Sequence, residues 1–168
     1  TPISGTSGGD EFGFSVSSNA DGTVIAIGSK LINNPLFDSG GVHIYKWEEN
    51  NWNNIGYIGG ENYYDWSGYS VSLNDNGNVI AIGAANNDGG GHDSGHVRVY
   101  DYVEGRSPKE WEQLGSDING EGNFDWSGYS VSLNANGTIV AIGAPYHDNN
   151  GSNRGHVEVY EYTNNDWQ

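Results

Sequence analysis

The sequence predicts an all-β protein, a β-propeller-type array of three four-stranded antiparallel blades with the last blade split between the N- and C-termini. The first observation is a repeat: residues 125–134 (DWSGYSVSLN) copy residues 65–74 letter for letter, and residues 10–19 (DEFGFSVSSN) copy them loosely. The second is period-2 alternation within each copy, and the third is an Asn-Gly or Asp-Gly pair between alternating runs. We expect one repeat domain over residues 1–168, with repeats at 10–58, 65–118 and 125–168 and residues 1–9 completing a fourth strand.

The first strand of each repeat has one bulky face and one small face. In the second copy, Tyr69, Val71 and Leu73 alternate with Gly68, Ser70 and Ser72. Large side chains pack well on one side of such a strand, and the small side lets a neighbouring sheet approach closely. The pattern therefore predicts sheets that are packed face to face.

The remaining strands of each repeat follow in order. The second strand is apolar on both faces and should lie in the middle of a sheet that is covered on both sides; it spans residues 24–28, 79–83 and 139–143. A variable polar loop leads to the third strand, at residues 41–47, 96–102 and 156–162. A fourth strand begins at Trp52, Trp111 and Trp167 and is complete, to Ile58 and Ile118, in the first two repeats. Four short strands per repeat is the count of a propeller blade.

Composition and charge exclude several classes of partner. The 168 residues include 27 Gly, 11 Tyr and 6 Trp, which favours strands and turns. Six basic residues against 22 acidic ones give a net charge of −16, which repels nucleic acid and anionic lipid. No stretch is long and apolar enough for membrane insertion. The chain has no Cys, so disulfides and thiol catalysis are excluded.

The repeat unit resembles the FG-GAP repeats of β-propellers, including those of integrin α-subunit heads. The resemblance is carried by FGFSVS, NADGTVIAIG and GGVHIY in the first repeat and by SGYSVSLNANGTIVAIGAP and GHVEVY in the third. The two ends of the family's name stand at Phe12-Gly13 and at Gly143-Ala144-Pro145. The resemblance implies a propeller fold and an extracellular or cell-surface location.

Some members of that family carry a calcium loop of the form DxDxDG between the first two strands. This chain departs from the motif, because Asp21 and Asp75 give those two loops one carboxylate each and the third loop has none. Calcium takes six to eight oxygen ligands. Asp21 and Asp75 are therefore only weak metal candidates, a plain hairpin turn is favoured, and no cofactor is expected.

The two termini look like complementary halves of one strand. Trp167 and Gln168 begin a fourth strand, and Thr1, Pro2 and Ile3 continue one. Because a ring of three blades is too small, we expect the N-terminal segment of one chain to complete the C-terminal edge of another, in a ring or a filament. The alternative is a segment of a longer propeller or repeat array.

Acidic and imidazole side chains offer further candidate sites. Asp10, Asp65 and Asp125 recur before the first strand of each repeat, and an acid repeated in this way favours a turn cap over a catalyst. Metal ligation by the pairs His92/His96 and His147/His156 is one interpretation, but their loop and strand positions favour solvated histidines.

Sequons and aromatic side chains add two more expectations. Two sequons place glycosylation candidates at Asn136 and Asn150. The in-register Trp52, Trp111 and Trp167 favour packing of the outer strand over sugar stacking.

Together these features predict a non-enzymatic extracellular or cell-surface module with a structural and interaction role. We expect it to assemble with itself or to bind other surface proteins through the loops after Gly28, Gly83 and Gly143. One alternative is a lectin-like propeller that binds glycans through exposed aromatic faces. Another is a fragment of a larger adhesion propeller. A hydrolase is least favoured, because no nucleophile elbow of the GxSxG type occurs.

Overall fold

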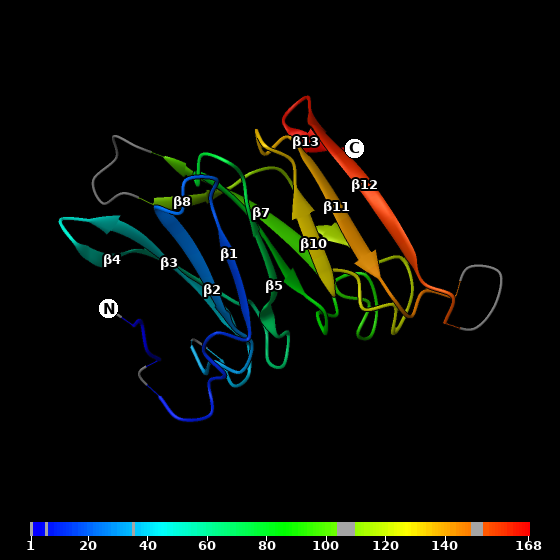
Figure 1. Cartoon of the computed structure of the whole chain (residues 1–168). Coiled ribbons are helices and arrows are strands. Elements are labelled where there is room, and N and C mark those ends of the chain that lie inside the picture. The colour runs from blue at the N-terminus through cyan, green and yellow to red at the C-terminus, as the bar shows by residue number, and fades with distance from the viewer. Residues whose placement is uncertain (1, 6, 35, 104–109, 149–152) are drawn as a thin grey trace.

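The computed structural model describes residues 2–5, 7–34, 36–103, 110–148 and 153–168. These residues form thirteen strands and no helix, which confirms the all-β prediction. The strands make three antiparallel sheets that lie side by side (Figure 1). Sheet 1 holds β1 (Ser15–Ser18), β2 (Val24–Ser29), β3 (Gly41–Glu48) and β4 (Asn51–Gly59); sheet 2 holds β5 (Ser67–Leu73), β6 (Val79–Ala84), β7 (His96–Val103), β8 (Glu110–Gln113) and β9 (Ile118–Asn119); sheet 3 holds β10 (Ser130–Leu133), β11 (Ile139–Ala144), β12 (His156–Thr163) and β13 (Asp166–Trp167).

The connection between the first two strands of each sheet is a hairpin, as predicted. The Oδ1 atoms of Asn19, Asn74 and Asn134 each accept a hydrogen bond from the backbone N–H five residues later, at 2.9–3.0 Å. The glycine of each turn has a φ between 71° and 76°, which a side chain would disfavour. The Asn side chain and the glycine together fix the same turn three times.

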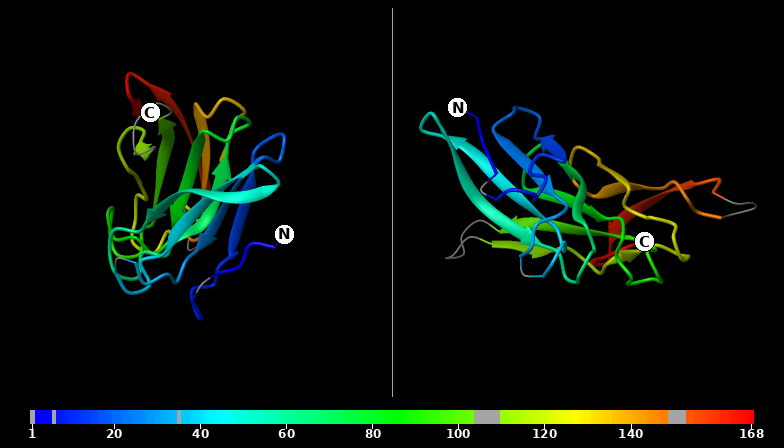
Figure 2. Two further views of the ribbon diagram at one scale, coloured as in Figure 1. Left: turned by 90° about the vertical axis from the view of Figure 1, so that its left-hand side faces the viewer. Right: turned by 90° about the horizontal axis from the view of Figure 1, so that it is seen from below.

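Two hydrophobic cores fill the spaces between the three sheets. One core includes Ile44 of sheet 1 and Ile80 of sheet 2, and the other includes Val99 of sheet 2 and Ile142 of sheet 3. Figure 2 shows the three sheets from two further directions. The prediction that the second strand is covered on both sides is correct for β6, which is buried along its whole length. It is wrong for β11, where buried and exposed residues alternate because only one face of sheet 3 packs against a neighbour.

The inner strands β1, β5 and β10 approach one another closely through small residues. Ser15 Oγ donates a hydrogen bond to the carbonyl of Gly68 at 2.7 Å, and Ser70 Oγ makes the same bond to Gly128. Ser72 Oγ accepts a bond from the backbone N–H of Leu133 at 2.9 Å. The small face predicted from the sequence therefore serves contact between neighbouring sheets.

The fourth strand differs between sheets 1 and 2. In sheet 1, β4 is continuous apart from a bulge opposite Ile44 and Tyr45. In sheet 2 the strand is interrupted, because Tyr100 pairs with Gln113 whereas Val97 pairs with Ile118. Between these two pairs, the outer segment has two more residues than the facing stretch of β7, whereas the bulge in sheet 1 has one extra residue. The outer strand is therefore broken into β8 and β9.

The segment before β1 does not complete a strand. Among its described residues, 2–5 and 7–14, no strand occurs, and Thr1 lies outside the described residues. At the other end, Trp167 is 8% exposed and lies in β13, which pairs with β12, and Gln168 exchanges two backbone hydrogen bonds with Glu161. Within this chain, Pro2 and Ile3 therefore do not extend the strand that Trp167 begins.

Candidate metal centre

The repeated aspartates before β5 and β10 each bind two segments of the chain through one carboxylate. Asp65 and Asp125 are buried, and the Oδ2 atom of each accepts a hydrogen bond from the backbone N–H three residues earlier, at 2.9 and 2.8 Å. This confirms the predicted turn cap for Asp65 and Asp125, and the cap at Asp10 stays a prediction. Each carboxylate also binds the loop that follows the second strand of its own repeat: Asn87 Nδ2 donates to Asp65 at 2.9 Å, and His147 occupies the equivalent place beside Asp125.

His147 is oriented by Asp125. Its Nδ1 atom lies 2.7 Å from Asp125 Oδ2. Because an ionised carboxylate can only accept a hydrogen bond, the ring nitrogen that faces it carries the proton. In the neutral ring, Nε2 is then the nitrogen with a free lone pair, and it points toward Glu121, whose Oε2 lies 3.9 Å away.

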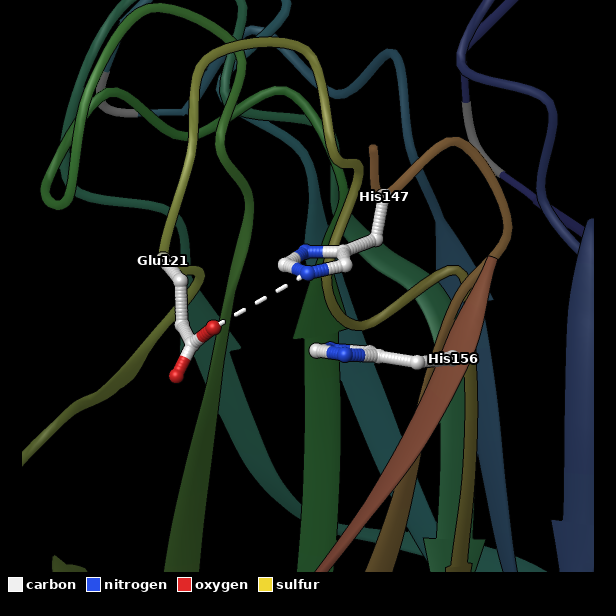
Figure 3. Close-up of side chains that lie close together, drawn as sticks. All are labelled: Glu121, His147 and His156. Carbon is white, nitrogen blue, oxygen red and sulfur yellow. Dashed lines mark ion pairs between the residues drawn. The ribbon is translucent and has the colours of Figure 1, made fainter. Parts of the chain in front are cut away.

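Two further side chains meet at His147. The ring of His156 stacks on the ring of His147 with centroids 3.8 Å apart and planes inclined by 19°. Glu121 reaches the pair from the connection between β9 and β10 (Figure 3). One ligand atom from each of Glu121, His147 and His156 lies within 4.8 Å of the others. The group borders an open hollow of about 470 Å³ lined by Glu121, Gly122, Asn123, Asp125, His147 and Asp148.

This arrangement has the components of a transition-metal site. Imidazole nitrogen and carboxylate oxygen bind Zn²⁺ at about 2.0–2.2 Å. Such a bond needs ligand atoms closer together than they are here, and the largely exposed Glu121 side chain is free to rotate inward. A carboxylate on the far nitrogen of a ligating histidine is the usual outer support of such sites, because it fixes the tautomer and raises the basicity of the ring. Asp125 provides that support.

The prediction of solvated histidines is correct for His92 and wrong for three others. The His92 side chain is 66% exposed. His96 and His147 are buried and His156 is only partly exposed, because each lies against a sheet or a connection of the neighbouring repeat. Burial lowers the pKa of His96 to about 4, with a smaller contribution from the Arg98 charge.

The weak calcium candidates lie apart from this centre. Asp21 Oδ1 accepts hydrogen bonds from the backbone N–H and the hydroxyl of Thr23, and these bonds lower the pKa of Asp21. Asp75 is exposed at the tip of its hairpin. Neither belongs to any of the three clusters of metal-ligating side chains found in the described part of the chain.

The remaining residues singled out in the sequence are the glycosylation candidates and the outer tryptophans. Asn136 is exposed, and its side chain accepts a hydrogen bond from the Thr138 hydroxyl at 2.8 Å. Asn150 lies outside the described residues. Trp111 and Trp167 pack against the two cores, as predicted.

Comparison with known proteins gives one family match and several structural likenesses. Residues 119–160 match the family model described as the FG-GAP repeat. No curated protein matches the sequence. Among solved structures, two proteins provisionally described as 6-phosphogluconolactonases resemble this chain. The one from Bacteroides uniformis has a TM-score of 0.60 and 10% identity over 91% of this chain and 37% of that one. The one from Bacteroides fragilis has a TM-score of 0.59 and 11% identity over 91% and 36%.

A third solved structure, Sqt1 from Saccharomyces cerevisiae, has a TM-score of 0.58 and 14% identity over 95% of this chain and 34% of that one. This chain thus spans little more than a third of the length of these structures. At such identities the likeness is one of fold.

These findings overturn the predicted function. The expected self-assembling structural module is wrong, as are its lectin-like and adhesion-fragment alternatives, because the structures that share the fold carry the names of proteins of other kinds. The extracellular or cell-surface location stays a prediction. Within the described residues, no helix is long and apolar enough to cross a membrane. The predicted FG-GAP resemblance is confirmed where the family model matches. The matched residues, 119–160, contain Glu121, Asp125, His147 and His156.

Proposed function

We propose that the third repeat binds one divalent transition-metal ion through Glu121, His147 and His156. The observation that carries this proposal is the 2.7 Å contact between Asp125 Oδ2 and His147 Nδ1. It orients the other ring nitrogen of a nearly buried histidine toward the Glu121 carboxylate, whose Oε2 atom lies 3.9 Å from Nε2. A metal ion satisfies both groups.

The ligand types favour zinc or a similar metal over calcium or magnesium. Two imidazoles and a carboxylate suit Zn²⁺, Co²⁺, Ni²⁺ and Cu²⁺, whereas calcium and magnesium prefer sites made wholly of oxygen. Binding of one ion by both rings requires one ring to tilt out of the stack, because the in-plane lone pairs of two nearly parallel rings do not meet at one point. The function proposed is binding alone, without a catalytic step.

We also propose that the three sheets are blades of a propeller-type array. Support comes from the up-and-down order of the strands in each sheet and from the neighbouring inner strands β1, β5 and β10. In this framework the metal lies at a connection between two blades, because Glu121 belongs to the link from sheet 2, whereas His147 follows β11 and His156 begins β12 of sheet 3.

The test is titration of the chelator-treated protein with Zn²⁺ by calorimetry, and with Co²⁺ by visible absorption. We expect one equivalent, a dissociation constant of about 10 µM or tighter, and the absorption bands of cobalt bound by nitrogen and oxygen. The sharpest variant is His147→Asn. Asn87 occupies the equivalent place in sheet 2 and donates to Asp65, so this change removes the imidazole while an amide can still bind Asp125.

We expect His147→Asn to weaken binding by about 100-fold or more, and Asp125→Asn by about 10- to 100-fold. His92→Gln is the matched control, because His92 is an exposed histidine beside Asp88 and Asp93 in another repeat. Binding should survive this change. Absence of saturable binding in the wild type, or unchanged binding in His147→Asn, contradicts the proposal.

A further inference from the structure

The second and third repeats place different charges at one equivalent position. His96 pairs with Ala84 and Arg98 pairs with Ile82 across β6 and β7. In the third repeat, His156 pairs with Ala144 and Glu158 pairs with Ile142. Arg98 and Glu158 therefore occupy the same register position, two residues after equivalent histidines. Glu61 and Glu121 are the matching carboxylates of the preceding connections.

In the second repeat, Arg98 supplies a cation inside the protein. Its side chain is 6% exposed, and its Nη1 atom lies 2.8 Å from Glu61 Oε1. Nη2 donates a hydrogen bond to the carbonyl of Gly59 at 3.1 Å. The guanidinium carbon lies 5.6 Å from the centre of the Tyr100 ring. A positive charge thus neutralises Glu61 at the place where the third repeat has its candidate metal centre.

In the third repeat, this cation is replaced by an anion. Glu158 Oε2 lies 3.7 Å from His156 Nε2, and the Glu158 side chain is 20% exposed. Glu121 Oε2 lies 3.9 Å from His147 Nε2, so each of the two carboxylates lies beside one of the two stacked rings. Relative to the second repeat, the substitution of an acid for a base changes the local charge by two units.

We propose that the residue at this position determines whether the space beside the connection holds a metal ion: Glu158 is the fourth ligand in the third repeat, and Arg98 takes the place of the metal in the second. This inference rests on the metal binding proposed above. Four protein ligands, two imidazoles and two carboxylates, make a tetrahedral site without an open position, which is the form of a structural zinc site. The second repeat keeps Glu61, His96 and Asp117 as a cluster of ligand atoms, and Glu61 in this cluster pairs with Arg98.

The experiment exchanges the two residues and counts bound metal. For Glu158→Arg we expect loss of the single Zn²⁺ and Co²⁺ equivalent, at least about 100-fold weaker binding, with a cooperative thermal transition retained, because the guanidinium can pair with Glu121 as Arg98 pairs with Glu61. Glu158→Gln keeps the size of the side chain and should weaken binding by about 10-fold. Arg98→Glu alone leaves Asn87 in the place of His147 and should bind no second ion tightly. Combined with Asn87→His, it should add a second equivalent, which the additional change His96→Asn abolishes.

The outcomes separate this inference from the proposed function. If the wild type binds no metal, the proposed function fails and this inference fails with it. If the wild type binds one equivalent and Glu158→Arg binds as tightly, the proposed function stands and this inference is overturned. Should Arg98→Glu not fold, Glu158→Arg alone decides, because its guanidinium–carboxylate pair already exists in the second repeat. A Co²⁺ spectrum of the wild type that indicates six-coordinate geometry also overturns the assignment of Glu158 as the fourth ligand.

Discussion

Replacement of Gly83 by alanine tests how closely sheets 2 and 3 approach. A Cβ atom at Gly83 would lie 2.1 Å from the carbonyl oxygen of Gly128 in the neighbouring sheet and 2.4 Å from Ser70 Oγ. A carbon and an oxygen need about 3.3 Å, so the sheets must separate by roughly 1 Å. Gly83 does not have a positive φ, so the backbone itself accepts alanine. The effect of the substitution therefore depends only on the space for the added methyl group between the two sheets.

The expected loss of stability follows from three contributions. Insertion of a methyl group into a packed interface costs about 1–3 kcal/mol, and loss of the hydrogen bond from Ser70 to Gly128 costs about 1 kcal/mol. Reduced freedom of the unfolded chain returns about 0.4–1 kcal/mol. We therefore expect Gly83→Ala to lower the free energy of unfolding by about 2–3 kcal/mol, measured by urea denaturation monitored by circular dichroism.

Gly143→Ala is the matched control. Gly143 occupies the same place in β11, but a Cβ atom there meets only the side chain and carbonyl of Ser130, in its own sheet. The Ser130 hydroxyl can rotate away, so we expect a change within about 0.5 kcal/mol. Equal losses in the two variants, or a more stable Gly83→Ala protein, would refute the reasoning, because the contact between sheets would then not limit the packing.

Two further predictions concern buried side chains. Trp167→Ala should cost about 3–5 kcal/mol in the same assay, because the ring packs in the second core and its Nε1 donates to the carbonyl of Leu114 at 2.7 Å; a loss below 1 kcal/mol would contradict this. His96 has a folded-state pKa of about 4, below its ordinary value of 6.5, so the unfolded chain binds the proton first. Its stabilising contribution is complete above pH 6.5 and declines as the pH falls toward 4, by at most about 1.4 kcal/mol per pH unit. His96→Asn should lessen this decline in the free energy of unfolding, and identical pH profiles for the two proteins would contradict the assignment.

The fold could be predicted because its determinants are local. Alternation in the copies of DWSGYSVSLN specifies strands with a small face, and the Asn and Gly of each turn specify a hairpin without help from distant residues. The interruption between β8 and β9 could not be predicted in this way. It depends on which residues of β7 pair with the outer segment, and this register is set by packing against the neighbouring sheet.

The candidate site could be predicted only in part. The role of Asp125 as a turn cap follows from its local position, but its contact with His147 joins segments 22 residues apart. A signal was nevertheless present in the sequence. Alignment of the repeats places His147 where Asn87 stands and Glu158 where Arg98 stands. Differences between copies of a repeat indicate where one copy has acquired its own chemistry, whereas the identical stretches mark shared packing.

Sheet 2 packs against both other sheets, so the three sheets are not equally stabilised by their neighbours. Sheet 2 is covered on both faces, whereas the described parts of sheets 1 and 3 each share one core with it. In a linear array of this kind, stability is the sum of each unit and its contacts with its neighbours, so the end units are held by half as many interfaces. Glu121 lies at the connection from sheet 2, whereas His147 follows β11 and His156 begins β12, so the cluster lies across the boundary between sheets 2 and 3. An ion bound there would add a contact between sheets 2 and 3. The stability of sheet 3 would then depend on the metal concentration.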